Sequence, residues 1–364
     1  MNKSAVLIGG GGAVVATAGF GAATFCGIGS MQEYNDSIAK SRATLTETSQ
    51  LRNCIGMATL AANSHNAQAW SFHIENNQIQ IRPDYKKRTA VVDPDDHHLF
   101  VSLGCAAENL SLAAAAGGFA GELSFDSSES SGLLYNFRAG KKIIPPLLAA
   151  ITQRQSTRNI YDGKIVPASD LALLFDAAKI QGVDVVLISD RAQIDKLRDI
   201  VIAANTVQMS DAAYLRELKS WLRYNPHEAL TKGDGLYSAT SGSPNLPDWL
   251  GSMMVDLTYS AKSENEKYAR QLDSSSGIAV FVAKIEDREH WTKVGRCCQR
   301  FALQATALGL KTAFMNQPVE VAKFRPDLAA MVGMPGRRPD IVMRFGYGPA
   351  MPYSTRRPLD AVLV

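Results

Sequence analysis

The spacing of apolar residues in the first part of the chain predicts a helix, a β-hairpin, a second helix and a loop. Trp70, Phe72 and Ile74 alternate with polar residues, which is the period of a strand with one buried face. The second helix is apolar on nearly every side and is therefore expected to be buried. The Ser- and Gly-rich stretch that follows it is interpreted as a linker or surface loop. These elements span Thr44–Ala62, Trp70–Ile81, Val101–Gly118 and Ser124–Gly140.

The later part of the chain alternates helices with short apolar strands. Pro167 and Ser169 mark the start of one helix. A long stretch rich in proline and glycine, Tyr224–Gly251, is interpreted as a lid-like loop. The expected helices are Asp170–Lys179, Ala192–Val207 and His290–Leu310, and the expected strands are Val183–Ile188, Gly277–Ile285 and Asp340–Phe345.

Two of the predicted helices resemble each other. Gly104–Gly118 aligns without gaps on Gly295–Gly309, and each segment has small side chains and ends at a glycine, the usual helix stop. Helix, loop, strand and small-residue helix follow in the same order in both parts. We therefore expect two related half-domains around a common core, residues 33–145 and 146–364.

The N-terminal segment, residues 1–32, has a different character. No charged residue occurs from Ser4 to Gln32, and Lys3 precedes this run. About 20 mostly apolar residues can cross a membrane, so a membrane anchor with the bulk of the chain outside is expected. A cleaved signal peptide is the alternative, which makes the protein anchored or exported. A lipoprotein site at Cys26 and a dinucleotide-binding turn at Gly9–Gly12 are disfavoured.

Composition and charge exclude several classes of protein. The 364 residues are 46% apolar and 20% charged, as in an ordinary globular protein. A net charge of +3 and the absence of a basic cluster give no reason to expect nucleic-acid binding. The five cysteines match no disulfide or zinc pattern, and His97, His98 and His290 lack ligand spacing, so no metal site is predicted.

The triplet Arg154-x-Ser156-x-Arg158 is the first candidate for binding chemistry. Two guanidiniums with a hydroxyl between them can converge on one phosphate, because each guanidinium offers forked hydrogen-bond donors. A solvated basic turn is the competing interpretation. Arg356, within Thr355-Arg-Arg-Pro358, adds a further cation with phosphate-binding potential or belongs to an ordinary charged tail.

The second candidate is the polar loop between Ala62 and Trp70. Its members Asn63, Ser64, Asn66 and Gln68 carry amides and a hydroxyl, which offer donors and acceptors together, as the imide-like edge of a flavin ring requires. His65 lies in the same loop and is either a ring contact or a surface residue. A simple turn is the competing interpretation.

Taken together, these motifs resemble the nitroreductase superfamily and, within it, the Acg-like branch with two nitroreductase-type halves in one chain. The family's FMN-phosphate motif matches Arg154, Ser156 and Arg158. Its Pro-Ser-x-x-Asn-x-Gln-Pro-Trp loop resembles residues 62–70, and its terminal arginine before a proline resembles Arg356. The resemblance runs from about Arg52 to the C-terminus.

The resemblance implies an α+β fold in which an antiparallel-dominated sheet flanked by helices is duplicated. It implies FMN as cofactor, NAD(P)H as reductant and a nitro, quinone or similar small-molecule acceptor. The flavin carries the chemistry, so no catalytic side chain is required. The phosphate motif and the loop lie in different halves, which predicts one FMN site in a monomer that acts as a pseudo-dimer.

Two departures bear on this expectation. Alanines, Ala62 and Ala69, stand where the family has prolines, and Asn63 stands where a serine is common. These changes predict a less rigid loop and weaker flavin binding. A non-catalytic protein that sequesters flavin beneath a lid is therefore the alternative, followed by a membrane-anchored module for another phosphorylated ligand.

Overall fold

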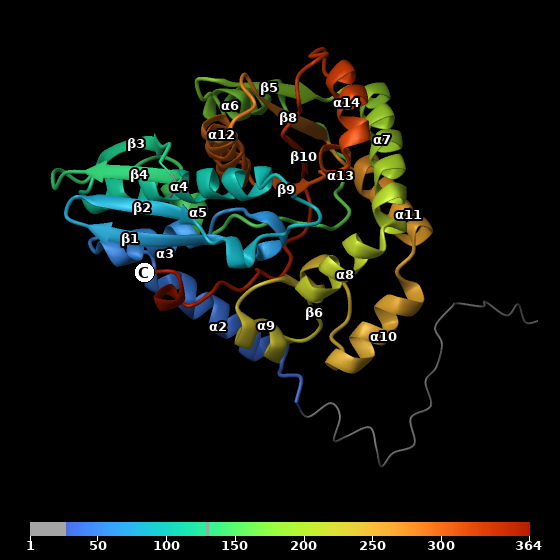
Figure 1. Ribbon diagram of the computed structural model, residues 1–364, viewed down its shortest axis with the longest axis horizontal. Coiled ribbons are helices and arrows are strands. Elements are labelled where there is room, and N and C mark those ends of the chain that lie inside the picture. The colour runs from blue at the N-terminus through green and yellow to red at the C-terminus, as the bar shows by residue number, and fades with distance from the viewer. Residues whose placement is uncertain (1–26, 129–130) are drawn as a thin grey trace, which may run out of the picture.

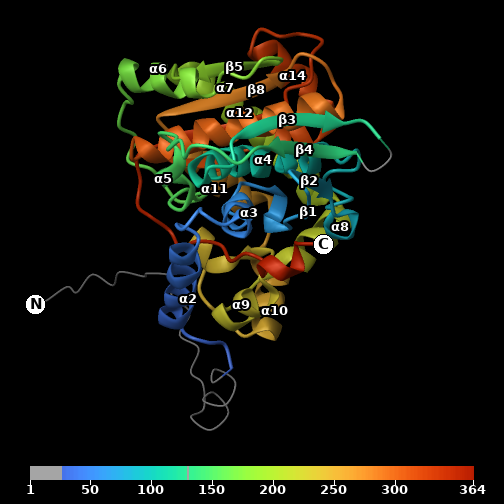
Figure 2. The ribbon, with the colours of Figure 1, turned by 90° about the vertical axis from the view of Figure 1, so that its left-hand side faces the viewer.

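A computed structural model of the chain describes residues 27–128 and 131–364. It contains two four-stranded antiparallel sheets with helices packed between and around them (Figures 1 and 2). Helix α4, His97–Gly117, packs on the first sheet, and helix α12, Arg288–Ala307, packs on the second. Because α4 and α12 also pack on each other, they form the centre of the molecule. The expected α+β fold with antiparallel sheets is confirmed.

The two sheets have the same strand order. The first sheet contains β1 Trp70–Glu75, β2 Gln78–Pro83, β3 Gly121–Asp126 and β4 Gly132–Phe137 in the order β1-β2-β4-β3. The second contains β5 Val183–Ile188, β8 Gly277–Ala283, β9 Lys311–Phe314 and β10 Ile341–Gly346 in the order β5-β8-β10-β9. In both sheets the central helix connects the second strand to the third. This repeated topology is the structural counterpart of the sequence repeat.

The halves differ in the connection between their first two strands. Two residues, Asn76 and Asn77, connect β1 to β2, whereas residues 189–276 connect β5 to β8. This insertion holds five helices and a short parallel strand pair. The helices are α7 Arg191–Ser210, α8 Ala212–Trp221, α9 Pro226–Lys232, α10 Asp248–Thr258 and α11 Ala261–Asp273, and the strands are β6 Leu222–Arg223 and β7 Leu236–Tyr237.

The remaining α-helices are short or peripheral. They are α2 Met31–Thr44, α3 Leu51–Thr59, α5 Leu148–Ile151, α6 Ala168–Ala177, α13 Gln317–Glu320 and α14 Arg325–Met331. Helix α3 packs on α4, and α6 packs on α12, so each central helix has a companion from its own half.

Two glycines allow the central helices to approach closely. An ideal Cβ on Gly104 would lie 1.9 Å from the carbonyl oxygen of Thr292, and one on Gly295 would lie 1.9 Å from that of Val101. Thr292 precedes Gly295 by three residues, and Val101 precedes Gly104 by three. The contact is therefore reciprocal, as in a two-fold symmetric helix pair, and it explains the glycines in the sequence repeat.

Two extended segments cover sheet edges. The C-terminal arm of the second half pairs with the edge strand β1 of the first sheet, where the Phe72 amide donates to the Val362 carbonyl at 2.7 Å and the Val364 amide donates to the Phe72 carbonyl at 2.9 Å. The segment that opens the second half pairs with the edge strand β9 of the second sheet, where the Thr157 amide donates to the Thr312 carbonyl at 2.8 Å. Together they cover one edge of each sheet.

Several predicted elements are confirmed. The hairpin is β1–β2, the buried helix is α4, and the strands predicted at 183–188, 277–285 and 340–345 are β5, β8 and β10. The helices predicted at 170–179, 192–207 and 290–310 are α6, α7 and α12.

Three other expectations were wrong. Thr44–Ala62 is not one helix, because α2 ends at Thr44 and α3 begins at Leu51. Ser124–Gly140 is not a linker, since it forms most of the β3–β4 hairpin, whose buried residues Leu133, Tyr135 and Phe137 alternate. Ser127 and Ser128 follow β3, and Ser131 precedes β4. Tyr224–Gly251 is not a simple loop, because it holds α9, β7 and the start of α10.

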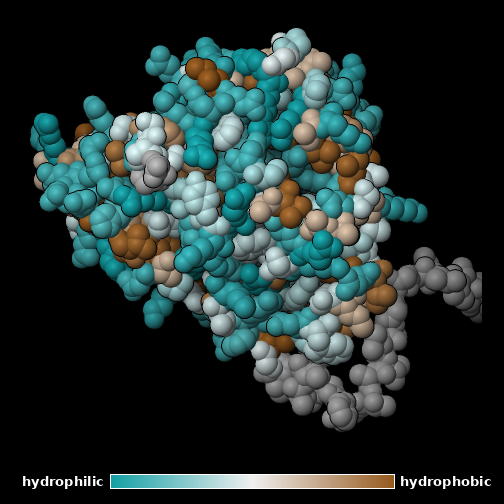
Figure 3. Space-filling model, viewed as in Figure 1, coloured by the Kyte–Doolittle hydropathy of each residue, from teal (hydrophilic) through white to brown (hydrophobic). Residues whose placement is uncertain are grey.

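The predicted membrane segment lies largely outside the described residues. Among residues 27–128 and 131–364, the one helix long and apolar enough to cross a membrane is α4, and 89% of its apolar window is buried. Such burial is typical of a core helix. The face in Figure 3 is mostly hydrophilic with scattered apolar side chains. Helix α10 exposes Trp249, Met253 and Leu257.

The glycine crossing leads to a stability prediction. Gly104→Ala should destabilise the fold by about 2 kcal/mol or more, because the new methyl group would meet the Thr292 carbonyl oxygen and force the helices apart. Urea unfolding would measure this loss. Gly140→Ala is the matched control, since a Cβ there meets nothing within 4 Å. Equal stability of the two variants would contradict a tight helix crossing.

Candidate functional site

A cavity of ≈ 380 Å³ lies at the N-terminal half of α4. This volume falls in the range of about 300–1,000 Å³ that is usual for small-molecule sites. Its wall combines both halves and the insertion. The lining includes Ala62, Asn63, Ser64 and His65; His98, Val101, Ser102 and Cys105 of α4; Arg158; Tyr214, Tyr224, Tyr237, Tyr259 and Tyr268 from the insertion; and Phe314, Asn316, Gln317 and Glu320 after β9.

The loop at 63–68 has an unusual backbone. His65, Asn66 and Gln68 have φ angles of 49°, 55° and 54°, in the left-handed region that non-glycine residues seldom occupy. Such conformations cost about 1–3 kcal/mol each and persist where surrounding contacts impose them. Here the Asn63 side-chain oxygen accepts from the Gln68 amide at 2.9 Å. The backbone therefore turns Asn63, Ser64 and His65 toward the cavity.

Gln68 and Asn66 hold this loop in place. Gln68 is fully buried, donates to the Gly233 carbonyl at 2.9 Å and accepts from the Arg357 amide at 2.8 Å. Asn66 donates to the Thr355 carbonyl at 3.2 Å. Neither residue lines the cavity. These two predicted site residues thus connect the loop to the insertion and to the C-terminal arm.

Arg154 and Arg356 meet at the C-terminal end of α3. Arg154 Nη2 donates to the Leu60 carbonyl at 2.9 Å. Arg356 donates to the carbonyls of Thr59, Leu60 and Ala61 at 2.6–3.3 Å, and to the Asn66 side-chain oxygen at 2.8 Å. Free carbonyls at a helix C-terminus attract cations. The next residue, Ala62, belongs to the cavity wall, so the two guanidiniums lie directly behind it.

A third arginine from the first half joins this group. Arg42 donates to the Thr152 carbonyl at 2.6 Å and stacks 3.9 Å from the centre of the Tyr353 ring. Burial and repulsion from Arg154 lower the pKa of Arg42 to about 10. Burial and the other two arginines lower the pKa of Arg356. We call Arg42, Arg154 and Arg356 the arginine cluster.

The arginine cluster has excess positive charge. In the described part of the chain, no carboxylate forms an ion pair with any of its three guanidiniums, whose hydrogen-bond acceptors are carbonyls and one amide oxygen. Arg42 and Arg154 are buried, and the Nε of Arg154 has no partner among the described residues. Buried charges are costly unless paired. The cluster is therefore suited to an anion.

Of the other two members of the Arg-x-Ser-x-Arg triplet, only Arg158 is among the residues that line the cavity. Ser156 forms an isolated parallel bridge with Thr312 at the start of β9, which holds the segment extended. Arg158 lines the cavity, and burial lowers its pKa. The structure thus places Arg154 in the arginine cluster and Arg158 at the cavity, with Ser156 between them.

Burial keeps the imidazole in the cavity wall neutral. Burial and the neighbouring Arg158 lower the pKa of His65 to about 4. Its Nδ1 lies 3.1 Å from the Ser64 hydroxyl. Burial also raises the pKa of Glu320, which accepts from Gln208 at 2.6 Å. At neutral pH the cavity therefore offers the neutral imidazole of His65 beside the cation of Arg158.

The tyrosines and the residues after β9 were not identified in the sequence. The tyrosines come from α8, α11 and the segments flanking α9 and α10, and their spacing shows no common face. The sequence indicated only that residues 224–251 could cover a cleft. With these residues included, the arrangement suits an elongated ligand that carries an anion at one end and a polar planar ring at the other.

Comparison with known proteins agrees on one family. The sequence profile of the Nitroreductase family matches residues 151–348, more than half of the chain. A Mycobacterium tuberculosis protein with the provisional name NAD(P)H nitroreductase Rv3131 is 26% identical over 328 residues, covering 86% of this chain and 90% of the relative. A second, acg, is 21% identical over 353 residues, covering 88% and 96%.

Two solved structures of nitroreductases are similar to part of this chain. A nitroreductase with bound FMN from Desulfitobacterium hafniense has a TM-score of 0.39 and 14% identity, covering 60% of this chain and 97% of its own. The FMN-dependent nitroreductase NfnB from Mycobacterium smegmatis, in complex with NADPH, has a TM-score of 0.36 and 15% identity, covering 55% and 86%.

The low pKa of His65 predicts a loss of stability in acid. Between pH 6.5 and about 4 the unfolded chain takes up a proton at His65 and the folded chain does not, so the free energy of unfolding falls as the pH falls. Asparagine tolerates the left-handed backbone at this position and does not titrate. In His65→Asn the free energy of unfolding should therefore fall by about 2 kcal/mol less over this pH range, a value reduced for the partial exposure of the His65 side chain.

Urea unfolding of the ligand-free protein at pH 7.5 and pH 4.5 would measure this effect. At pH 7.5 both side chains are neutral, so that comparison isolates any change in packing. Identical slopes of stability against pH for the two proteins would contradict a buried neutral imidazole.

Proposed function

This chain belongs to the Nitroreductase family, and from that premise we propose that it is an FMN-dependent oxidoreductase that takes electrons from NAD(P)H. Two relatives that each cover more than four fifths of the chain are named as NAD(P)H nitroreductases, which supports the choice of reductant. The proposed acceptor is a small molecule with a nitro, quinone or similar group. The flavin, when bound, accepts a hydride and passes electrons on.

The observation that carries the proposal is the arginine cluster behind the cavity wall. Three cations without a carboxylate partner in the described part of the chain fit a phosphate. The cavity beside them has room and hydrogen-bonding groups for a ring. We assign the phosphate to Arg154, Ser156 and Arg356, and the ring side to Arg158, Asn63 and Ser64.

Asn66 and Gln68 hold the loop of the proposed site in position. Each connects the left-handed loop to a segment far away in the sequence, Asn66 to the C-terminal arm and Gln68 to Gly233 and Arg357. A flavin needs Asn63 and Ser64 in one orientation, and these two buried amides maintain it. Loss of either should loosen the ring contacts without removing the phosphate contacts.

The remaining residues of the cavity exclude water from the reacting face. Five tyrosines and several leucines of the insertion form part of the cavity wall. Such a wall lowers the local dielectric constant and leaves room for a planar acceptor against the ring. Neutral His65 adds no positive charge at neutral pH, and Lys267, the other cationic residue of the lining, pairs with Glu264. Arg158 is therefore assigned to orient a polar acceptor or the ring edge.

A flavin-sequestering protein is the second candidate, and the insertion favours it. Residues 189–276 close over the cavity with α8, α10 and α11, and a tightly packed cover would block the acceptor. Steady-state oxidation of NADPH with a nitroaromatic or quinone acceptor separates the candidates. Tight FMN binding without turnover would establish storage, whereas turnover would establish the reductase.

We also propose that the N-terminal segment attaches or exports the protein. The described chain starts beside α9, where Gly29 lies against His227, and the nearby α10 exposes Trp249, Met253 and Leu257 (Figure 1). An exposed apolar helix near the leader supports a membrane on that side. Fractionation of the full-length protein tests this, and a fully soluble cytosolic protein would contradict it.

The assignment of Arg154 to the phosphate and of Arg158 to the ring side predicts a difference between two flavins. Arg154→Ala and Arg158→Ala should each weaken FMN binding at least tenfold, because a charge-assisted hydrogen bond contributes about 1.5–3 kcal/mol. Riboflavin, which lacks the phosphate, should be much less sensitive to the loss of Arg154. Fluorescence titration of both flavins measures the two affinities.

Arg52→Ala is the matched control for these variants. Arg52 lies on the same helix as the carbonyls that bind the arginine cluster, but it is exposed and pairs with Asp360. It should leave both affinities unchanged. Equal losses for FMN and riboflavin in Arg154→Ala would show that this arginine acts only by holding α3.

The single site predicts one FMN per chain in a monomer. The first half contributes Asn63 and Ser64, and the second contributes Arg154, Ser156 and Arg158, with no second copy of either set expected. Titration monitored by absorbance, with the mass measured by light scattering, should therefore saturate near one. Asn66→Ala combined with Arg158→Ala should show coupling rather than additivity. Two flavins per chain, or binding only by a dimer, would contradict this assignment.

A further inference from the structure

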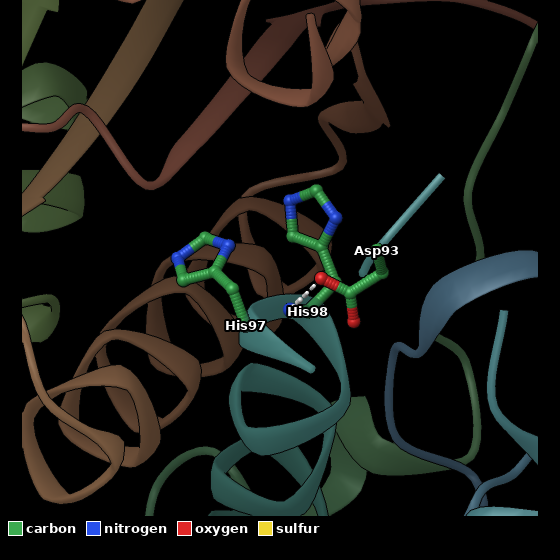
Figure 4. Close-up of side chains that lie close together, drawn as sticks. All are labelled: Asp93, His97 and His98. Carbon is green, nitrogen blue, oxygen red and sulfur yellow. Dashed lines mark hydrogen bonds between the residues drawn. The ribbon is translucent and has the colours of Figure 1, made fainter. Parts of the chain in front are cut away.

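Three buried side chains meet at the N-terminus of α4, away from the arginine cluster. Asp93 precedes the helix, and His97 and His98 form its first turn (Figure 4). All three are buried, and one ligand-type atom from each lies within 4.8 Å of the others. The sequence spacing did not indicate a site because adjacent histidines usually diverge on a helix. Here the two rings turn toward the same space beside the Asp93 carboxylate.

Asp340 fixes the orientation of both rings. Its carboxylate lies 2.8 Å from Nε2 of His97, and its backbone hydrogen-bonds the His98 ring. In the described part of the chain, Nδ1 of His97 and Nε2 of His98 have no hydrogen-bond partner. A neutral imidazole carries one N–H. Since that N–H faces Asp340 in each ring, both partnerless nitrogens present lone pairs.

The space between the three side chains is therefore bounded by acceptors. The Asp93 oxygens accept the backbone N–H groups of His98 and Leu99 at 3.0 and 2.9 Å, which holds the carboxylate in place. A water molecule could donate to both ring nitrogens, whereas a divalent cation binds both lone pairs and also compensates the charge of the buried carboxylate.

We propose that Asp93, His97 and His98 bind a divalent cation of the kind that imidazole and carboxylate ligands prefer, with Zn²⁺ as the representative ion. Two imidazoles and one carboxylate form a familiar ligand set for such ions. A ligating histidine usually donates its other ring N–H to a carboxylate, as His97 does to Asp340. Ligand atoms 2.0–2.2 Å from an ion lie about 3–4 Å apart. From separations of up to 4.8 Å, the ion would draw the ligand atoms together by up to about 1–2 Å.

The charges around the three side chains are of both signs. Asp95, Asp96 and Glu286 lie on neighbouring segments, where Asp95 and Glu286 pair with Arg338, and Asp96 pairs with Arg88. Arg325 and Arg337 also act on His97 and Asp340, respectively. The ligand set itself carries the Asp93 carboxylate, whose charge a divalent ion would compensate.

The proposed ion connects the two halves of the chain next to the cavity. Asp93 and the histidines belong to the first half, and Asp340 lies just before β10 in the second. His98 also lines the cavity. Binding of the ion would fix the first turn of α4, on which Val101, Ser102 and Cys105 of the cavity wall depend for their position.

Zn²⁺ binding by the full-length protein, stripped with a chelator and dialysed, tests the proposal. Isothermal titration with Zn²⁺ alone should show one ion per chain. His97→Ala and His98→Ala should each weaken binding at least a hundredfold, and Asp340→Asn about ten- to a hundredfold, as is usual for a residue behind a ligand. No bound Zn²⁺, or the same affinity in all variants, would overturn the proposal.

His290→Ala is the matched control. His290 and Asp287 form a hydrogen-bonded pair at the start of α12, the equivalent position in the second half. This variant should bind Zn²⁺ like the unaltered protein, and an equal loss would overturn the assignment to α4.

A second measurement uses the unaltered protein and therefore tests the proposal even if the histidine variants do not fold. Pulsed electron paramagnetic resonance of the unaltered protein loaded with Cu²⁺ should detect two imidazole nitrogens. Detection of one imidazole nitrogen, or of none, would overturn the proposal. That result would favour a protonated His98 that pairs directly with Asp93.

Discussion

The crossing of α4 and α12 at Gly104 and Gly295 is the contact on which the rest of the structure depends. Because neither residue has a side chain, the helix backbones touch, and each glycine packs on a carbonyl of the other helix. Polar pairs flank the crossing: buried Glu108 accepts from Arg296 at 3.0 Å and from Arg300 at 2.8 Å. Gln299 donates to Asn109 at 2.8 Å. These buried bonds specify one register for the helix pair.

This register places the two halves of the candidate site side by side. Gln299 of α12 also accepts from the Ala62 amide at 3.2 Å, so the second half holds the start of the first half's loop. Cys105 lines the cavity while its sulfur lies 3.6 Å from that of Cys298. A helix pair that slipped by one turn would separate the loop from Arg158 and would open the cavity.

The duplicated halves are nonetheless specialised. The strand order is the same in both sheets, but only the second half carries the insertion at 189–276, and only the first carries the left-handed loop. The cavity wall takes the loop at residues 63–65 from the first half, and Arg158 and the insertion from the second. The C-terminal arm stabilises this arrangement, because the Asn66 side chain depends on an arm that ends on β1.

The sequence by itself determined the local features of this protein. Apolar spacing located the β1–β2 hairpin, α4, α12 and three of the four strands of the second sheet, β5, β8 and β10, since spacing records which face of an element is buried. It did not locate β9, which has only four residues. The aligned glycines predicted the duplication, and the arginine and amide motifs pointed to the family.

Tertiary structure alone decided which of these residues meet. It brought Arg42 beside Arg154 and Arg356, placed the insertion's tyrosines over the cavity, and brought Asp340 beside His97. It also turned Asn66 and Gln68 away from the cavity, because their left-handed backbone depends on contacts with residues far along the chain. The spacing of apolar residues reports only which face of an element is buried. Which side chains meet at a site depends on how elements far apart in the sequence pack on one another.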